Sequence, residues 1–412
     1  MTELVINVSN IISPLCYSII RVEPYDTCSF NCIYCYTQWY WQRKHGHPKV
    51  RVTAIKEFLA LAKKTYEKSL KPVPARLSTL IDPFQQIEKQ KKATLRILKI
   101  ALKYEYPLII NTKSPLLVKD PWNRIISSLA DKGLVVVQFS LSILDEGRAS
   151  ILEPHASSVK ERLQVMRILA EQGIPVVLRL SPFIPRKSIE PYDYDDFASL
   201  LKELGVRHVI VEALRFTQPE LSMILRKIGI NDIELEQYSL RIIEGGKPLY
   251  KPSRKLLYNE YSLLKDSLVK HGINFATCKE GFFSLHSSND CCGFYLFKSN
   301  IGIGKRITLY EFYLKAKQEP ISLDKLDEVY EELCEQGYLC SNNMEEYPRR
   351  IKKPFKNHER KLLRVLRSKG HLVHVTPELD IVDKKIIWRG IRLKRIHHSN
   401  AHGSDSSSST LI

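Results

Sequence analysis

Apolar, β-branched runs alternate with segments of helical periodicity through the first half of the chain. Near-continuous apolar runs such as Leu134-Val-Val-Val and Pro175-Val-Val-Leu are typical of parallel strands covered by helices on both sides. Strands are predicted over residues 18–22, 75–80, 107–112, 134–142, 175–180 and 208–213. Helices are predicted between them, over 53–70, 86–104, 121–131, 157–172 and 193–204. Six such repeats with right-handed crossovers predict an α/β fold, a partial (β/α)6 barrel of TIM type, with its chemistry at the C-terminal strand ends.

The last third of the chain has a different pattern. Helices are predicted over 255–271, 311–316, 323–336 and 357–368, a basic, proline-containing connector over 347–356, and short strands over 371–375 and 385–391. A helix followed by a two-stranded ribbon resembles a winged-helix unit. We therefore expect a barrel with a cysteine-containing extension (1–306), a basic α+β module (307–398) and a disordered serine-rich tail (399–412).

Charge is distributed unevenly along the 412 residues. The formal net charge is +18, and from Arg349 onward 16 Lys and Arg stand against 5 Asp and Glu. This asymmetry favours a polyanionic partner, most often nucleic acid, although a basic surface also aids solubility. No apolar run reaches the length of a membrane span, and residues 1–14 lack a basic region followed by an apolar core. We expect a cytoplasmic protein without a membrane partner, whose nine cysteines are ligands and thiols rather than a disulfide framework.

Three of these cysteines lie close together in Cys28-Ser-Phe-Asn-Cys32-Ile-Tyr-Cys35. A compact loop of this spacing turns three thiols toward one point, as a cubane iron–sulfur cluster requires, and leaves the fourth iron open for a cofactor or substrate. A zinc site is the alternative, but zinc sites usually pair two such cysteine knuckles and no second knuckle lies nearby. Buried, unreactive thiols are the other alternative.

This spacing resembles the signature of the radical SAM superfamily, and Tyr34 before the last cysteine fits it. Further stretches resemble the photolyase-like branch, related to spore photoproduct lyase, over roughly residues 22–214. The matching stretches are Ser78-Thr-Leu-Ile-Asp82-Pro-Phe-Gln, Asn111-Thr-Lys113-Ser, Phe139-Ser140-Leu-Ser142, Leu152-Glu-Pro-His, Glu161-Arg-Leu and Leu178-Arg179-Leu-Ser-Pro. No cysteine occurs between Cys35 and Cys278, whereas the lyase returns a hydrogen atom from a mid-barrel cysteine, so the namesake's reaction does not carry over.

The resemblance implies a [4Fe-4S] cluster on Cys28, Cys32 and Cys35, whose open iron binds S-adenosylmethionine. A cofactor with a carboxylate, an ammonium and a ribose needs a cation, hydroxyl donors and an acceptor nearby. The residues expected to bind it are Tyr34, Asp82, Thr112, Lys113, Ser140, Ser142 and Arg179. For each there is a local alternative, because Asp before Pro, and Thr or Ser after a strand, also cap turns and helices.

Three further thiols and a histidine lie in the loop from Cys278 to Cys292. Cys278, Cys291 and Cys292 are candidate thiol donors of a hydrogen atom or an electron. Cys278, His286 and Cys291 could instead hold a second metal or cluster, or the cysteines could simply pack.

The function that the resemblance implies is reductive cleavage of S-adenosylmethionine to a 5′-deoxyadenosyl radical, with electrons from an external ferredoxin- or flavodoxin-like donor. The basic C-terminal segment suggests that the radical acts on a nucleic acid, in repair or base modification. The alternatives are a peptide or small-molecule substrate, and a nucleic-acid-binding protein whose cluster is structural.

Overall fold

The computed structural model describes residues 3–37, 48–239 and 248–391 of the chain. A six-stranded parallel sheet in the order β1-β2-β3-β4-β5-β9 forms its centre, and in this order it does not close on itself. The expected α/β partial barrel is thereby confirmed. The strands are β1 (Ala75–Leu77), β2 (Leu108–Thr112), β3 (Val135–Leu141), β4 (Val176–Phe183), β5 (Val206–Ala213) and β9 (Asn274–Thr277).

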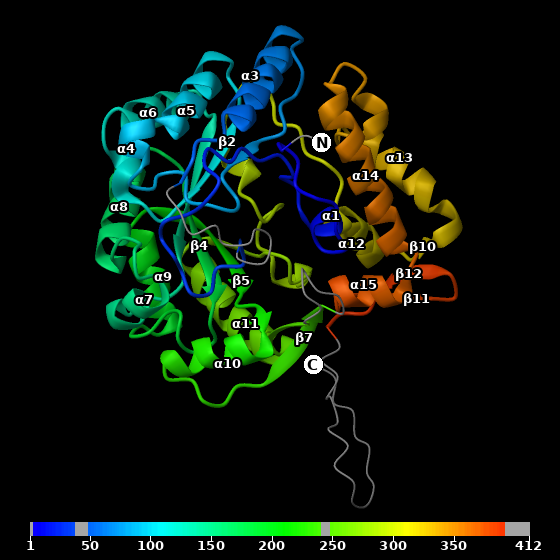
Figure 1. Cartoon of the computed structure of the whole chain (residues 1–412). Helices are drawn as coiled ribbons and strands as arrows, with labels where there is room; N and C mark the ends of the chain where they lie inside the picture. The colour runs from blue at the N-terminus through cyan, green and yellow to red at the C-terminus, as the bar shows by residue number, and fades with distance from the viewer. Residues whose placement is uncertain (1–2, 38–47, 240–247, 392–412) are drawn as a thin grey trace, which may run out of the picture.

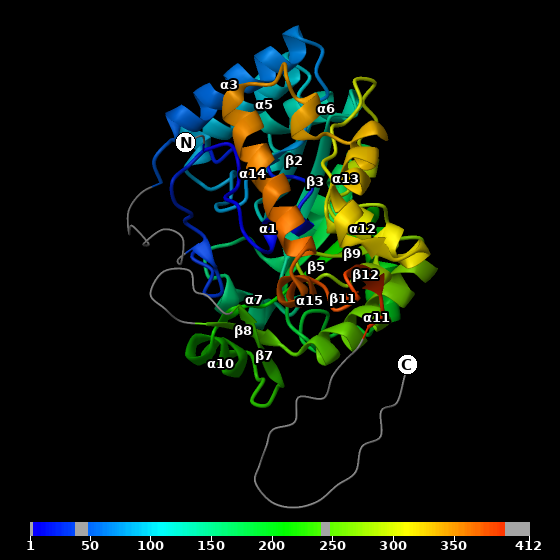
Figure 2. The same cartoon turned by 90° about the vertical axis from the view of Figure 1, so that its right-hand side faces the viewer.

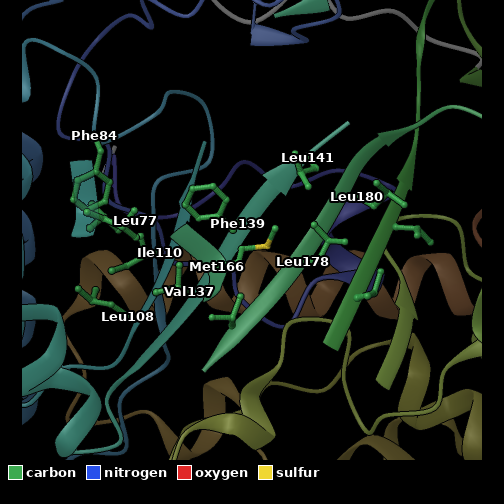
Figure 3. Close-up of a cluster of buried hydrophobic side chains, with 14 of the residues drawn as sticks. Leu77, Phe84, Leu108, Ile110, Val137, Phe139, Leu141, Met166, Leu178 and Leu180 are labelled. Atoms are coloured by element: carbon green, nitrogen blue, oxygen red, sulfur yellow. The ribbon is translucent and has the colours of Figure 1, made fainter. Parts of the chain in front are cut away.

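Helices cover the convex side of this sheet (Figure 1). They are α3 (Val52–Glu67), α4 (Glu88–Lys91), α5 (Ala93–Lys103), α6 (Trp122–Asp131), α7 (Glu146–Leu152), α8 (Val159–Glu171), α9 (Tyr194–Glu203) and α11 (Arg254–Lys270). Their apolar faces pack on every second strand residue, as Figure 3 shows for Leu108, Val137 and Phe139 beside Met166 of α8. A small side sheet, β6 (Phe216–Thr217), β8 (Leu249–Pro252) and β7 (Leu235–Ser239), follows with α10 (Gln218–Lys227).

The sixth strand of the sheet differs from the prediction. Residues 18–22 form only single bridges, Val5 to Ile20 and Arg21 to Arg76, so they lie beside β1 without forming a strand. The sixth strand is instead β9, which pairs with β5 and follows the helix that ends before Gly272. The helix predicted over 86–104 is divided in two, because Lys92 adopts a left-handed conformation with φ 51°.

Of the ribbon predicted from strands over 371–375 and 385–391, only the second strand is present, as β12, and it pairs with β11 instead. Two elements of the module were wrongly predicted. Residues 371–375 form a helix rather than a strand, because Leu372 and Val375, three residues apart, are the buried positions. The expected connector over 347–356 is the first half of a continuous helix that contains Pro354, since Ile351 and Phe355 are buried at helical spacing. The ribbon also gains a third strand, β10. The elements are α12 (Leu309–Gln318), β10 (Ile321–Ser322), α13 (Leu326–Glu335), α14 (Arg349–Leu366), α15 (Lys369–Val375), β11 (Leu379–Val382) and β12 (Lys385–Trp388).

Cys334 and Cys340 form a disulfide inside this module, a pairing that the sequence did not indicate. The remaining seven cysteines are free thiols. The module has its own hydrophobic core, which includes Leu309, Leu326 and Leu362. Among the described residues no helix has both the length and the apolar character needed to cross a membrane. The serine-rich tail and the last basic residues lie outside the described part of the chain.

Candidate functional site

The loop from Cys28 to Cys35 lies across the C-terminal edge of the sheet and is fixed at several points. The Gln85 side chain, in the loop after β1, accepts from the Ser29 amide at 2.6 Å and donates to the Thr27 carbonyl at 2.9 Å. The Ile33 amide donates to the Leu152 carbonyl at the end of α7. Asn31 has φ 56°, a left-handed turn that folds the loop back between the first two thiols. A short loop is thereby held over strands that are far apart in sequence.

The three thiols of this loop lie within electrostatic reach of one another. Burial, followed by the negative charges of Asp82 and Cys35, raises the pKa of Cys28 to about 12. Burial also raises the pKa of Cys32 well above its ordinary value, with Glu153 adding to it and Lys113 opposing it. In the described part of the chain, no group of three or more His, Cys, Asp or Glu side chains is already arranged around a metal position.

This donor set fits an iron–sulfur cluster. Three thiols from one loop would supply three sulfur ligands, and the raised pKa values of Cys28 and Cys32 reflect burial without enough positive charge to hold these two as thiolates. Bound iron supplies that charge, because a coordinating thiol is deprotonated by its metal.

Asp82 and Thr112 form a bracket at the ends of β1 and β2. The Asp82 carboxylate accepts from the Thr112 hydroxyl at 2.8 Å and from the Lys113 amide at 2.7 Å. It also accepts from the Phe84 amide at 2.9 Å, which is the turn-capping alternative that the sequence left open. Both carboxylate oxygens are engaged within the chain, so Asp82 and Thr112 fix the position of Lys113.

Glu153 is the centre of the site, and sequence reasoning did not select it. Its buried carboxylate forms an ion pair with Lys113 at 3.3 Å and another with Arg162 at 2.5 Å. It also accepts hydrogen bonds from the Tyr34 hydroxyl and, at 2.6 Å, from Ser142. Burial raises the pKa of Glu153, but Lys113, Arg162 and the two hydroxyls outweigh it and lower the pKa to about 2. Three of the predicted cofactor-binding residues therefore converge on one carboxylate that stays ionised.

Ser140 and Arg179 lie on neighbouring strands, paired in register across β3 and β4. Arg179 forms an ion pair with Glu212 of β5, and its Nη2 donates to the Cys278 sulfur at 3.7 Å. Glu212 also pairs with Lys279 at 2.7 Å. The carboxylate partner of Arg179 in this structure is thus Glu212, which the sequence offered no reason to select.

The late cysteines lie on the concave side of the sheet. Cys291 and Cys292 have sulfurs 3.7 Å apart, and Arg76 of β1 donates to the Cys292 sulfur at 3.0 Å. The Cys291 hydrogen bond, and then Arg76, lower the pKa of Cys292 to about 6 despite its burial. Cys292 is therefore the more acidic thiol of the pair, since the shared hydrogen bond and burial raise the pKa of Cys291 well above its ordinary value.

His286 does not join these cysteines. Its Nε2 meets the Thr277 hydroxyl at 3.0 Å, and its ring stacks on Tyr310 of α12 with centroids 5.6 Å apart. The second metal or cluster expected at Cys278, His286 and Cys291 finds no support, since the described residues hold no ready group of metal ligands.

Residues 22–198 match the model of the radical SAM superfamily. The chain is 32% identical over 155 residues to the uncharacterized protein ORF301 of Acidianus two-tailed virus. This aligned region covers 37% of this chain and 50% of that protein. It is 30% identical over 169 residues to the uncharacterized protein MJ0683 of Methanocaldococcus jannaschii, covering 40% of this chain and 60% of that one. The matched part thus spans between half and three fifths of these curated relatives.

Among solved structures, the chain is similar to spore photoproduct lyase complexed with dinucleoside spore photoproduct. The TM-score is 0.44 at 15% identity, over 63% of this chain and 77% of that one. It is also similar to Streptococcus suis SuiB bound to S-adenosylmethionine, with a TM-score of 0.42 at 13% identity, over 65% of this chain and 52% of that one.

Proposed function

Residues 22–198 of this enzyme belong to the radical SAM superfamily, and on that premise we propose that it modifies a nucleic acid by radical chemistry. The bound cluster and S-adenosylmethionine supply a 5′-deoxyadenosyl radical when an external ferredoxin- or flavodoxin-like donor provides an electron. Cys28, Cys32 and Cys35 are the residues that would hold the cluster.

The protein's own residues position and shield this chemistry. The charge of Lys113 acts on the Cys32 thiol of the cysteine loop, and Asp82 and Glu153 hold the backbone and the ammonium group of this lysine in place. Its role in the proposal is to bind the cofactor's carboxylate. The Tyr34 ring centroid lies 5.8 Å from the Lys113 nitrogen, and both side chains of this ion pair are largely buried. Ser140, Ser142 and Arg179 line the neighbouring strands.

The observation that carries the choice of nucleic acid is a stripe of basic residues along α14. Arg349, Lys353, Lys356, Arg360, Arg364 and Arg367 are all exposed and recur at spacings of three or four residues, which places them on one face of the helix. The opposite face is buried through residues such as Phe355 and Leu362. Figure 2 shows α14 along the side of the molecule turned toward the viewer.

Most of this stripe is free to bind a partner. Within the described residues, Lys353, Lys356, Arg360 and Arg364 form no ion pair, whereas Arg367 pairs with Asp327. An 18-residue helix is about 27 Å long, which corresponds to about eight phosphates of one strand at 3.4 Å each. A row of unpaired cations of this length suits a nucleic-acid backbone better than a small anion.

The test is a variant in which Lys353, Lys356, Arg360 and Arg364 are all replaced by Gln. It is expected to bind single-stranded RNA or DNA weakly. The slope of the logarithm of the binding constant against the logarithm of the salt concentration should be smaller in magnitude by about 3, because each lost phosphate contact removes about 0.7 to 0.9. The matched control replaces Lys89, Lys91, Arg96 and Lys99, exposed residues of α4 and α5, and should bind like the unchanged protein. Both variants should cleave S-adenosylmethionine normally.

Two results would contradict the proposal. If binding by the two variants depended equally on salt, the basic stripe of α14 would not be the surface that binds nucleic acid. A full-length protein that binds neither polymer at low salt would exclude nucleic acid as the substrate class, and would leave a peptide or small molecule as the target.

A further inference from the structure

The concave face of the sheet carries a row of polar side chains above an apolar floor. Ile109, Val136 and Val177 of β2, β3 and β4 pack there with Cys291, Cys292 and Phe294, on the opposite side from the helix-covered face. Strand alternation places Asn111, Gln138 and Arg179 two residues further along the same three strands, on the same concave face. Asn111 and Gln138 are partners in register. Asn111 and Gln138 therefore lie side by side, and Arg179 lies two residues nearer the C-terminal edge of the barrel, level with Ser140.

The orientation of the two amides follows from their neighbours. The Gln138 side chain lies 2.9 Å from the Cys292 carbonyl, and the Asn111 side chain lies 2.8 Å from the Ser78 carbonyl. A carbonyl oxygen only accepts, so the NH2 group of each amide must face it. The amide oxygens, Oε1 of Gln138 and Oδ1 of Asn111, are therefore turned the other way.

Both oxygens are buried and have no hydrogen-bond partner within the described part of the chain. Gln138 has no exposed surface at all. Nη1 of Arg179, on the next strand, is also buried without a partner. Native proteins rarely leave a buried acceptor without a hydrogen bond. Such groups in a barrel interior therefore point to a ligand that donates the missing hydrogen bonds. The row offers two acceptors and one donor to a group entering from the open edge.

We propose that Asn111 and Gln138 read the N–H donor edge of a nucleobase turned into the barrel. This inference rests on the proposed nucleic-acid substrate and names the part of it that enters. Enzymes that act on a base commonly extrude it from the stack and read its Watson–Crick edge. Two acceptors select a base that presents an exocyclic amino group. Guanine presents an amino group, a ring N–H and a carbonyl oxygen in that order along its edge. This order matches the Asn111 acceptor, the Gln138 acceptor and the Arg179 donor.

The matched probe for this selectivity is a pair of nine-nucleotide single strands that differ at the central base, guanine or hypoxanthine. Hypoxanthine lacks only the amino group. Anaerobic protein with S-adenosylmethionine present is expected to bind the guanine strand about fivefold more tightly, the effect of one hydrogen bond to a neutral group. In Asn111→Leu, which loses the acceptor for the amino group, the ratio should fall to about one. Gln138→Met loses the acceptor for the ring N–H that both bases carry, so it should bind both strands more weakly at an unchanged ratio. Equal binding of the two strands by the unchanged protein overturns the inference, even if either variant fails to fold.

The amino group of the cofactor's own adenine is the other source of the same donor chemistry. Calorimetric titration of S-adenosylmethionine into Asn111→Leu separates the two, because base reading predicts unchanged cofactor affinity in this variant. A fall in cofactor affinity without a change in the guanine-to-hypoxanthine ratio assigns the acceptors to the cofactor and overturns the inference. Failure of the proposed function is distinct, since it shows as no binding of either strand at low salt.

Discussion

Lys113 shows how a single side chain depends on partners distant in sequence. Asp82 holds its backbone amide and Glu153 its ammonium group, so the charge is fixed beside the cysteine loop before any cofactor binds. Lys113→Met should keep the cluster but weaken S-adenosylmethionine binding by about 2–5 kcal/mol, because a buried carboxylate loses its charged partner. Calorimetry and iron analysis measure the two effects separately.

Two controls sharpen the Lys113→Met result. Cys32→Ala should lose bound iron, and Lys89→Met, which changes an exposed lysine of α4, should leave both iron and cofactor affinity unchanged. Unaltered cofactor affinity in Lys113→Met would remove this lysine from the cofactor site.

The sequence could predict which residues gather at the site more readily than what each one contacts. The spacing of Cys28, Cys32 and Cys35 is local, so one loop explains it. Glu153 could not be selected in this way, because its importance comes from Tyr34, Lys113 and Arg162, which only the fold brings together. Its place in Leu152-Glu-Pro-His, a stretch that matches the photolyase-like branch, was the available signal, and it does not say what the carboxylate contacts. Likewise, the ion pair between Arg179 and Glu212 depends on the pairing of β4 with β5.

At the scale of elements, prediction succeeded where the apolar pattern was long and failed where it was short. Five of the six expected strands are confirmed in the sheet, and each is followed by helices that bury it. The four-residue strand β9 gives little pattern to detect, since its place is set by pairing with β5. In α15, the alternation of His371 to Val375 imitates a strand, and only packing of Leu372 and Val375 in the module core decides for a helix.

Helix α14 connects the two hydrophobic cores. Phe355 lies in the core of the barrel, whereas Leu362, two turns later, lies in the core of the module. Phe355→Ala should lower the free energy of unfolding by about 3–5 kcal/mol, since it empties a fully buried position. Lys356→Ala, one residue away on the exposed face, should change it by less than about 0.5 kcal/mol.

Because α14 belongs to both cores, barrel and module should unfold in one transition in both variants. Chemical denaturation followed by fluorescence and circular dichroism tests this. A separate early transition of the module in Phe355→Ala, with the barrel midpoint unchanged, would show that the helix does not couple them. The same coupling makes charge substitutions on α14 a cleaner test of nucleic-acid binding than deletion from Arg349 onward.

At the scale of the whole molecule, two buried histidines and one half-buried histidine link its parts. His208 of β5 meets the Tyr295 hydroxyl at 3.1 Å, and His286 lies between β9 and α12. His358 of α14 joins the N-terminal segment, donating from Nε2 to the Ile6 carbonyl at 2.8 Å and accepting at Nδ1 from Ser13. Burial lowers the pKa of His208 and His358 to about 4 and that of His286 to about 3.

These shifts predict that the protein loses stability in mild acid. An unfolded histidine gains a proton near pH 6.5, whereas the native ones stay neutral until about pH 4 or 3, so the unfolded state binds more protons between these values. Stability should therefore fall as the pH drops from 6.5 to 4, by up to about 3 kcal/mol for His358 alone. Glu378 acts in the opposite direction, because burial raises its pKa to about 7 and its contribution grows as the pH falls toward 4.5. Three histidines outweigh this one carboxyl, so the free energy of unfolding should decrease overall as the pH falls.

Urea denaturation at pH 7.5, 6, 5 and 4.5 measures this dependence, and His358→Gln, which keeps a donor and an acceptor but does not titrate, should make it weaker. A slope equal in His358→Gln and the unchanged protein would show that the junction between α14 and the N-terminal segment does not sense pH.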